Sequence, residues 1–477
     1  MLRSAITVIL AFTLFSTASA DEGSFSPCMD ADDAPALAGT QCALIPAPLD
    51  PAGGDLLDEE VNLFVRKFPA SGETRGDLWV IAGGPGESGA SLYSFIDKLQ
   101  TDLPGLDIFV PDHRGTGFST RLCPEEENPE SVGGAALAGA EWGSCYQYIN
   151  VNAERSRAFS VDNAANDLAV LLKATASERP VYVYGVSYGT QLVLRLMANH
   201  SLKLGGVILD SLTPLQDDER FDLSRRSLLV DNVGRAVLAR CDADKACHER
   251  MGVPADEVYA QVLANAAQEP EWLAEVPGGN LKHFMGALLD FPELRKFIPT
   301  VITGLMANDT APLNAVKVRL NEIALAFGAY PQSPASIPLV SIISRSENDL
   351  RPDMTKAELA EEESKLLFTS PLPGYLIDPG VPEYQTQGAS VSESRRRAFP
   401  IIVVHGTLDP KTAYDGAVDH VSVLRQNGRV SLMTVADAPH FILMTAPECF
   451  SEAARSLTTG RNMRDRTCRA DADEGLF

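Results

Sequence analysis

The sequence lacks an apolar run long enough to cross a bilayer. A membrane-spanning helix needs about 20 apolar residues, whereas the one strongly apolar run covers residues 5–15 and no later segment is long enough. A single Arg precedes this run and an Ala-x-Ala pattern ends at Ala20, which is typical of a secretory signal peptide at residues 1–20. Asp21 follows where a lipid anchor would require a cysteine. We therefore expect an exported protein, periplasmic or secreted, that is not embedded in a membrane.

Positive charge is also scarce. The 477 residues include 40 Lys and Arg against 64 Asp and Glu, which gives a formal net charge of −24 at pH 7. An acidic surface repels the phosphates of nucleic acids and the anionic head groups of lipids. We therefore expect neither a nucleic acid nor a membrane surface as a partner. Charge and composition leave the oligomeric state open.

Metal-binding spacings are missing as well. The chain has neither Cys-x-x-Cys nor His-x-x-x-His, so we expect no zinc site. Its eight cysteines occur instead as near neighbours in sequence, namely Cys28 and Cys42, Cys123 and Cys145, Cys241 and Cys247, and Cys449 and Cys468. Eight thiols allow 105 pairings, but export and clustered spacing favour four local bridges over buried free thiols.

The stretch from Val181 to Thr190 organises the rest of the chain. Four β-favouring residues lead into a Gly-x-Ser-x-Gly pattern around Ser187, and a helix-like segment follows at residues 191–197. On a sharp turn from strand to helix, the serine of this pattern presents its hydroxyl to a substrate. The short pattern also occurs by chance, so an ordinary strand-to-helix loop is the alternative. The flanking strand and helix favour Ser187 as a nucleophile.

A glycine-rich loop at residues 83–89 follows a buried strand at residues 78–82. The loop lacks the Lys-Ser/Thr that a phosphate-binding P-loop needs. An oxyanion loop fits better, because glycine lets a main-chain N–H approach a developing negative charge closely. The predicted donors are the N–H groups of Gly84 and of Tyr188, the residue after the nucleophile. A plain turn between strand and helix is the alternative.

A serine hydroxyl becomes a good nucleophile when an imidazole, oriented by a carboxylate, takes its proton. In folds with this kind of turn the groups follow in the chain order Ser, acid, His. Asp409 follows a buried strand that begins at Pro400, and His440 lies in the loop after the next strand, at residues 430–435. We therefore predict a catalytic triad of Ser187, Asp409 and His440. Asp210, at the end of its own strand, is the alternative acid.

Strands and helices alternate from about residue 61 to residue 210. This alternation predicts an α/β fold with a mostly parallel sheet and helices on both faces. Residues 211–398 are mainly helical in pattern and too long for one strand crossover, so we expect a cap inserted into the sheet domain. Residues 21–210 and 399–477 then form the two parts of that domain.

In combination these patterns resemble a known family. The similarity is to the prolyl iminopeptidase and tripeptidyl aminopeptidase branch of the α/β-hydrolases, and it is carried by Ala82–Gly86, Asp112–Gly117, Gly185–Thr190, Val207–Asp210, Gly406–Pro410 and His440. Ala82 stands where many members have His. The resemblance implies the α/β-hydrolase fold and a serine exopeptidase that acts at a free N-terminus without a cofactor.

The expected function is thus an exported serine aminopeptidase that releases N-terminal residues or short peptides through an acyl-enzyme. A carboxylesterase or lipase-like hydrolase needs the same triad and differs in what the cap admits. A hydrolase fold used only for binding has no reason to keep all three triad residues. An aminopeptidase must recognise a protonated α-amine, and a carboxylate at the pocket mouth is the physical means. Glu347, in a cap stretch with family resemblance and with Asp349 beside it, is the predicted substrate-binding carboxylate.

Overall fold

The structure is a computed structural model that describes residues 24–53, 56, 58–386, 397–461 and 464–469. The predicted signal peptide and its cleavage site lie outside the described residues. The predicted triad, the predicted oxyanion loop and all eight cysteines lie within them.

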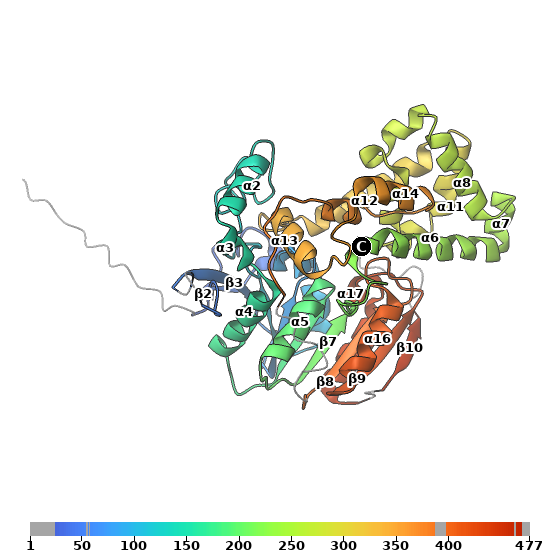
Figure 1. Ribbon diagram of the computed structural model, residues 1–477. Coiled ribbons are helices and arrows are strands. Elements are labelled where there is room, and N and C mark those ends of the chain that lie inside the picture. The colour runs from blue at the N-terminus through green and yellow to red at the C-terminus, as the bar shows by residue number, and fades with distance from the viewer. Residues whose placement is uncertain (1–23, 54–55, 57, 387–396, 462–463, 470–477) are drawn as a thin grey trace, which may run out of the picture.

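Among the described residues, ten strands form a single sheet at the centre of the molecule (Figure 1). They are β1 (Ser26–Pro27), β2 (Gln41–Pro48), β3 (Glu60–Phe68), β4 (Gly76–Ile81), β5 (Leu106–Pro111), β6 (Val181–Val186), β7 (Gly206–Asp210), β8 (Pro400–Gly406), β9 (Arg429–Ala436) and β10 (Arg466–Arg469). The spatial order is β1-β2-β3-β5-β4-β6-β7-β8-β9-β10. The pairs among β1, β2, β3 and β5 are antiparallel and all others are parallel. The mostly parallel sheet predicted from the sequence is confirmed.

Helices cover both faces of this sheet. In the part of the chain that the structure describes they are α1 (Ile96–Asp102), α2 (Glu141–Val151), α3 (Ala153–Arg157), α4 (Val161–Ala174), α5 (Tyr188–Asn199), α6 (Arg226–Ala243), α7 (Lys245–Met251), α8 (Ala255–Ala266), α9 (Leu281–Leu288), α10 (Pro292–Arg295), α11 (Ile298–Met306), α12 (Ala311–Phe327), α13 (Ile337–Glu347), α14 (Lys356–Ser364), α15 (Leu372–Leu376), α16 (Tyr414–Leu424), α17 (Ile442–Thr445) and α18 (Pro447–Thr459).

The buried strands read as continuous apolar runs because both faces of the sheet are covered. In β4, Trp79 and Ile81 join the hydrophobic core under α4, α5 and α16. Leu78 and Val80 point the other way and join the core under α1 and α18. All four side chains are at most 2% exposed. The alternation along one strand therefore fixes the two layers of helices.

The chain between β7 and β8 is a helical insertion, and among the described residues it contains no strand. Most of its helices pack on a hydrophobic core of their own, and in Figure 1 α6, α7, α8 and α11 form a lobe beyond the sheet. Helix α13 differs, because Leu339, Ile342 and Ile343 join the core under α4 and α5. The insertion is thereby anchored to the sheet domain at α13.

A buried ion pair fixes the loop that follows β5. Arg114 donates two hydrogen bonds of 2.6 Å to the carboxylate of Asp167 on α4. Asp112 of the same loop accepts a 2.7 Å hydrogen bond from the N–H of Gly89, and burial raises the pKa of Asp112 to about 6. The loop therefore ties α4 to the glycine-rich loop after β4.

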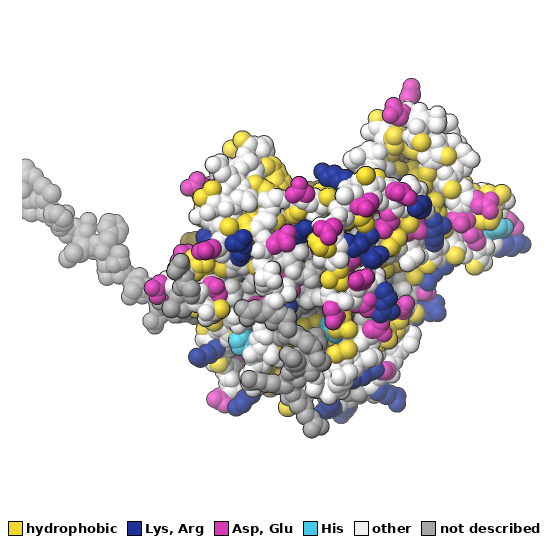
Figure 2. Space-filling model, in the orientation of Figure 1, with side chains coloured by type: hydrophobic (Ala, Val, Ile, Leu, Met, Phe, Trp, Pro, Cys, Tyr) yellow, Lys and Arg dark blue, Asp and Glu magenta, His cyan; other side chains and the backbone are white. Residues whose placement is uncertain are grey.

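The surface carries both signs of charge. In Figure 2 acidic side chains are interspersed with Lys and Arg over the insertion and over α16. Several of these charges pair, such as Arg220 of the insertion with Asp419 on α16 at 2.8 Å. Exposed pairs of this kind contribute about 0–1 kcal/mol each. On the face shown, the excess of acidic residues is thus distributed among basic ones.

Four disulfides staple the described chain. They are Cys28–Cys42, Cys123–Cys145, Cys241–Cys247 and Cys449–Cys468, and no cysteine of the described residues is free. These are the four local pairs favoured by the cysteine spacing. Disulfides are consistent with an exported protein. None of the described helices is long and apolar enough to cross a membrane.

We predict that non-reducing peptide mapping will recover these four bridges. Each closes a short loop, which stabilises the fold by about 2–3 kcal/mol per bridge on the chain-entropy model. Reduction should therefore lower the thermal unfolding temperature of the purified protein. Eight alkylatable thiols in the unreduced protein would contradict the assignment.

Candidate active site

Ser187 lies on the sharp turn between β6 and α5. Its backbone has φ 56° and ψ −125°, a combination that residues other than glycine rarely adopt. The Ser187 N–H donates to the carbonyl oxygen of Asp210 at 2.9 Å, and the Ser187 carbonyl accepts from the N–H of Thr190 at 2.8 Å. A Cβ on Gly189 would lie 2.5 Å from the carbonyl oxygen of Ile81. The turn therefore depends on glycine where α5 crosses β4.

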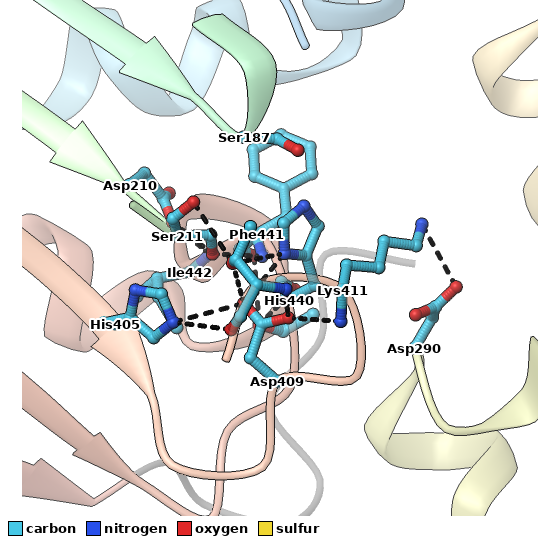
Figure 3. Close-up of polar contacts among 12 residues, drawn as sticks. Ser187, Asp210, Ser211, Asp290, His405, Asp409, Lys411, His440, Phe441 and Ile442 are labelled. Atoms are coloured by element: carbon cyan, nitrogen blue, oxygen red, sulfur yellow. Dashed lines mark hydrogen bonds and ion pairs between the residues drawn. The ribbon is translucent and has the colours of Figure 1, made fainter. Parts of the chain in front are cut away.

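Asp409 and His440 form the second part of the site. His440 Nδ1 lies 2.8 Å from Asp409 Oδ2, and both residues are buried. Asp409 also accepts hydrogen bonds from the N–H groups of Lys411 and Thr412, at 2.7 and 2.8 Å. Ser187 and His440 line the same cavity, and in Figure 3 the imidazole lies between Ser187 and Asp409. The structure thus brings together the three residues of the predicted triad.

The surroundings of Asp409 keep it ionised. Burial alone would raise the pKa of Asp409, but His440, His405 and the Thr412 N–H outweigh burial, so its pKa lies below the ordinary value. His405, which precedes the acid in the chain, has Nε2 3.6 Å from Asp409 Oδ2 and 2.9 Å from the Thr412 carbonyl oxygen. An ionised acid at Nδ1 fixes the imidazole tautomer that leaves Nε2 free to take the Ser187 proton.

Asp210, the alternative acid, holds the turn after His440 instead. Its carboxylate accepts hydrogen bonds from the N–H groups of Ile442 and Leu443, at 2.8 and 2.9 Å. The hydroxyl of Tyr184 donates a third at 3.0 Å. Burial raises the pKa of Asp210 to about 6. Asp210 is therefore a positioning residue, and the acid bonded to His440 is Asp409.

The predicted oxyanion donors lie beside the nucleophile. Tyr188 is the first residue of α5, so its N–H has no carbonyl one turn earlier in the helix. Gly84 has φ +109°, and a Cβ there would lie 2.7 Å from the nitrogen of Gly86. A Cβ on Gly83 would lie 3.2 Å from Ser187 Cβ, so the glycine-rich loop packs directly against the nucleophile. This arrangement suits two N–H groups that hold an oxyanion.

Among the described residues, two cavities meet at Ser187. The large cavity has a volume of about 230 Å³, and its polar lining includes Gly84, Glu87, Ser187, Asp290, Lys411 and His440. The small cavity has a volume of about 50 Å³, and its lining includes Gly84, Ser187, Tyr188, Gln191, Arg226 and Lys411. Leu92, Phe291, Phe327 and Met444 make part of the large cavity apolar. The two cavities share the nucleophile and the oxyanion loop.

The large cavity carries two carboxylates and one ammonium. Lys411 Nζ pairs with Asp290 Oδ2 at 3.1 Å (Figure 3), and Asp290 comes from the insertion just after α9. The Glu87 carboxylate has no hydrogen-bond or ion-pair partner among the described residues. Its side chain is exposed to solvent through the cavity, yet the protein around it raises the pKa of Glu87 while Lys411 and His440 oppose the rise. The large cavity is therefore acidic.

Glu347, the predicted substrate-binding carboxylate, lies elsewhere. It is 6% exposed and ends α13. Its two oxygens accept hydrogen bonds from Arg195 at 3.2 Å and from the Tyr384 hydroxyl at 3.0 Å. Asp349 beside it forms an ion pair with Arg345. Glu347 lines neither cavity at Ser187, and its contacts tie α13 to α5.

Sequence reasoning missed most of the charged residues in the two cavities. Glu87 and Lys411 carried a usable signal, because one lies in the predicted oxyanion loop and the other follows the predicted acid by two positions. The sequence carried no such signal for Asp290, Arg226 and Gln191. The first two are placed by the folding of the insertion, and Gln191 by the side of α5 that faces the small cavity. Charge close to a predicted catalytic loop was the informative feature.

We predict that Asp210→Asn will impair both stability and the reactivity of Ser187. The amide cannot accept from both Ile442 and Leu443, and a buried donor without an acceptor costs about 1–3 kcal/mol. A displaced His440 should slow serine activation by about tenfold or more. Thermal unfolding and the rate of labelling by a fluorophosphonate measure the two effects.

Tyr184→Phe is the matched control for that substitution. It removes one donor to the same carboxylate but leaves both main-chain hydrogen bonds in place. Its effect on labelling should therefore be much smaller. Equal effects of the two variants would show that Asp210 does not position His440.

Solved structures similar to this chain include a proline iminopeptidase from Mycobacterium smegmatis, with 12% identity, a TM-score of 0.42 and coverage of 87% of this chain and 98% of that one. A bromoperoxidase from Bacillus anthracis has 14% identity and a TM-score of 0.40, with coverage of 87% and 100%. An esterase from Exiguobacterium antarcticum has 12% identity and a TM-score of 0.35, with coverage of 84% and 97%. Likenesses at such identities concern the fold alone.

In sequence, a relative is the "Putative hydrolase YuaR" of Escherichia coli (strain K12), 27% identical over 186 residues. The match spans 37% of this chain and 37% of the length of that relative. The family model of the alpha/beta hydrolase fold matches residues 78–248, from β4 through the serine turn to α7. The chain has the α/β-hydrolase fold.

Proposed function

We propose that this protein is a serine hydrolase that forms an acyl-enzyme at Ser187. The observation that carries the proposal is the hydrogen bond between Asp409 and His440, together with the cavity that His440 lines with a serine on a strained turn. The match to the α/β-hydrolase family supports hydrolase activity in general.

In the proposed reaction, the Ser187 hydroxyl attacks the carbonyl carbon of the substrate while His440 Nε2 takes its proton. Asp409 stabilises the resulting imidazolium, and the N–H groups of Gly84 and Tyr188 hold the oxyanion. His440 then gives the proton to the leaving group as the carbon–heteroatom bond breaks. Water repeats the attack on the acyl-enzyme and releases the acid.

We infer further that the substrate has a free amine next to the scissile carbonyl. Such an amine lies two bonds from the carbonyl carbon, so its partner must lie close to Ser187. A Cβ on Gly83 would lie 3.2 Å from Ser187 Cβ and 3.5 Å from Glu87 Oε2, so little more than the width of Gly83 separates carboxylate and nucleophile. A substrate ammonium would give Glu87 the partner it lacks. Glu87 therefore takes the role that the sequence suggested for Glu347.

These features together support an aminopeptidase. The apolar walls of the large cavity would receive the side chain of the first residue. A carboxylate beside the nucleophile favours cationic over neutral substrates by direct attraction. The four disulfides support a location outside the cytoplasm. The alternative is a carboxylesterase. The apolar walls would also suit an ester substrate, but an ester without an amine offers no cationic group for Glu87 to bind.

We predict that Ser187→Ala will abolish nearly all turnover and all fluorophosphonate labelling while the protein still folds. The members of a triad act as a unit, so the loss of one removes most of the effect. Mass spectrometry of labelled wild-type protein should locate the probe on Ser187. Labelling that survives the substitution would rule out this nucleophile.

We predict that Glu87→Gln will lower the preference for free-amine substrates. The ratio of kcat/KM for alanyl-p-nitroanilide to that for its N-acetyl form should fall about tenfold or more, because a hydrogen bond to a charged group contributes about 1.5–3 kcal/mol. The matched control is Glu73→Gln, since Glu73 is an exposed acid outside both cavities.

Two outcomes would count against the aminopeptidase. One is a wild-type enzyme that cleaves the N-acetyl anilide as fast as the free amine. The other is rapid hydrolysis of p-nitrophenyl esters with no cleavage of either anilide, which would favour the carboxylesterase. If Glu87→Gln leaves the ratio of the two kcat/KM values unchanged, Glu87 does not bind the amine.

A further inference from the structure

The small cavity beside Ser187 differs from the large one in charge. Arg226 and Lys411 both line it, and the acidic residue in its lining is Asp222. The Asp222 carboxylate already accepts the one proton of the Ser224 hydroxyl, whose oxygen lies 2.8 and 2.9 Å from its two oxygens, and the N–H of Leu350, at 2.7 Å. Asp222 is therefore engaged away from Arg226. Burial lowers the pKa of Arg226, and Asp409 and Asp290 oppose this effect from a distance, but none of the described carboxylates forms an ion pair or a hydrogen bond with it.

Arg226 supplies most of the positive charge that lines the small cavity. It is the first residue of α6, where the helical insertion reaches the nucleophile. Its guanidinium has no hydrogen-bond or ion-pair partner among the described residues, whereas Lys411 is paired with Asp290. Arg226 is half-buried. A half-buried guanidinium without a partner loses part of its hydration, which a bound anion would replace, and its planar fork suits a carboxylate.

Gln191 is a second donor without a partner. It lies on α5 one turn after Ser187, is 5% exposed, and lines the small cavity. Its Nε2 has no acceptor among the described residues. Buried donors are nearly always satisfied, so an unpaired one in a cavity wall indicates a ligand that accepts a hydrogen bond.

We propose that Arg226 and Gln191 form a subsite for a carboxylate of the substrate. A carboxylate can accept from both donors at once, whereas a cation would be repelled by Arg226. A volume of about 50 Å³ holds roughly three or four water-sized groups, which matches a carboxylate and the carbon that bears it. The subsite rests on the proposed hydrolase function, because its position beside Ser187 gives it a role.

The carboxylate can come from two places in a peptide. One is the free C-terminus of a short peptide, in which case Glu87 holds the ammonium at one end and Arg226 the carboxylate at the other. The other is the side chain of an acidic residue that directly follows the scissile bond. Both have the same recognition chemistry, and substrate pairs separate them.

The test compares substrates that differ only in this group. For wild-type enzyme, kcat/KM should be about tenfold or more higher for alanyl-alanine than for alanyl-alaninamide if the C-terminus binds. It should be higher by a similar factor for alanyl-glutamic acid α-amide than for alanyl-glutaminamide if the side chain of the second residue binds. Arg226→Met should bring the elevated ratio close to one, and Arg226→Lys should keep part of it. The matched control is Arg250→Met, an exposed cation on α7 outside both cavities.

Equal rates within both pairs for wild-type enzyme, or a ratio that Arg226→Met leaves unchanged, would overturn the subsite. A second measurement separates this failure from a failure of the proposed aminopeptidase. N-acetylalanine should inhibit p-nitrophenyl acetate hydrolysis about tenfold more strongly than N-acetylalaninamide, and this difference should vanish in Arg226→Met. If the ester is hydrolysed but the two compounds inhibit equally, the subsite is wrong while the hydrolase stands.

Discussion

The end of β7 is the point on which the catalytic arrangement depends. The carbonyl of Asp210 accepts the N–H of Ser187 at 2.9 Å, and its carboxylate accepts the N–H of Ile442 in the turn after the catalytic histidine. The next carbonyl, of Ser211, lies 3.2 Å from the hydroxyl oxygen of Thr412, whose main-chain N–H donates to Asp409 at 2.8 Å. Two consecutive residues therefore contact all three loops of the triad. This is possible because β6, β7, β8 and β9 are parallel neighbours whose carboxyl ends meet at one edge of the sheet.

The catalytic residues and two of the charged residues of the cavities come from different parts of the protein. The triad residues come from loops of the sheet domain, where His440 is hydrogen-bonded to Asp409. The main-chain N–H of Ser187 is bonded to the carbonyl oxygen at the end of β7. Asp290 and Arg226, by contrast, come from the helical insertion and reach opposite cavities. Lys411 belongs to the acid loop, lines both cavities and pairs with Asp290. Substitutions in the insertion can therefore change which charges surround Ser187 without altering the hydrogen bonds of the triad.

The difference between these two sources explains what the sequence could predict. The mostly parallel sheet and the positions of Ser187, Asp409 and His440 follow from local patterns, because a buried strand followed by a polar loop specifies where its carboxyl end lies. The position of Glu347 could not be predicted in this way. Its place in the sequence was compatible with a pocket or with a buried contact, and in the structure its carboxylate is buried against Arg195 and Tyr384. Asp210 ended a strand at the right edge, yet its geometry turns it toward main-chain donors rather than the imidazole. When tertiary packing alone decides where a side chain points, the sequence contains no periodicity or spacing that would reveal it.

The opposite charges of the two cavities also constrain how a substrate can enter. A peptide that places its ammonium beside Glu87 puts the following residue toward the shared wall at Gly84 and Ser187, from which the small cavity continues to Arg226. A reversed peptide would bring its carboxylate to Glu87 and its ammonium to Arg226. That orientation creates two like-charge contacts, which are unfavourable. Repulsion of the wrong orientation adds to attraction of the right one. Specificity in such a site therefore depends on the separation between Glu87 and Arg226 as much as on either charge alone, and that separation is set by the seating of α6 against the serine turn.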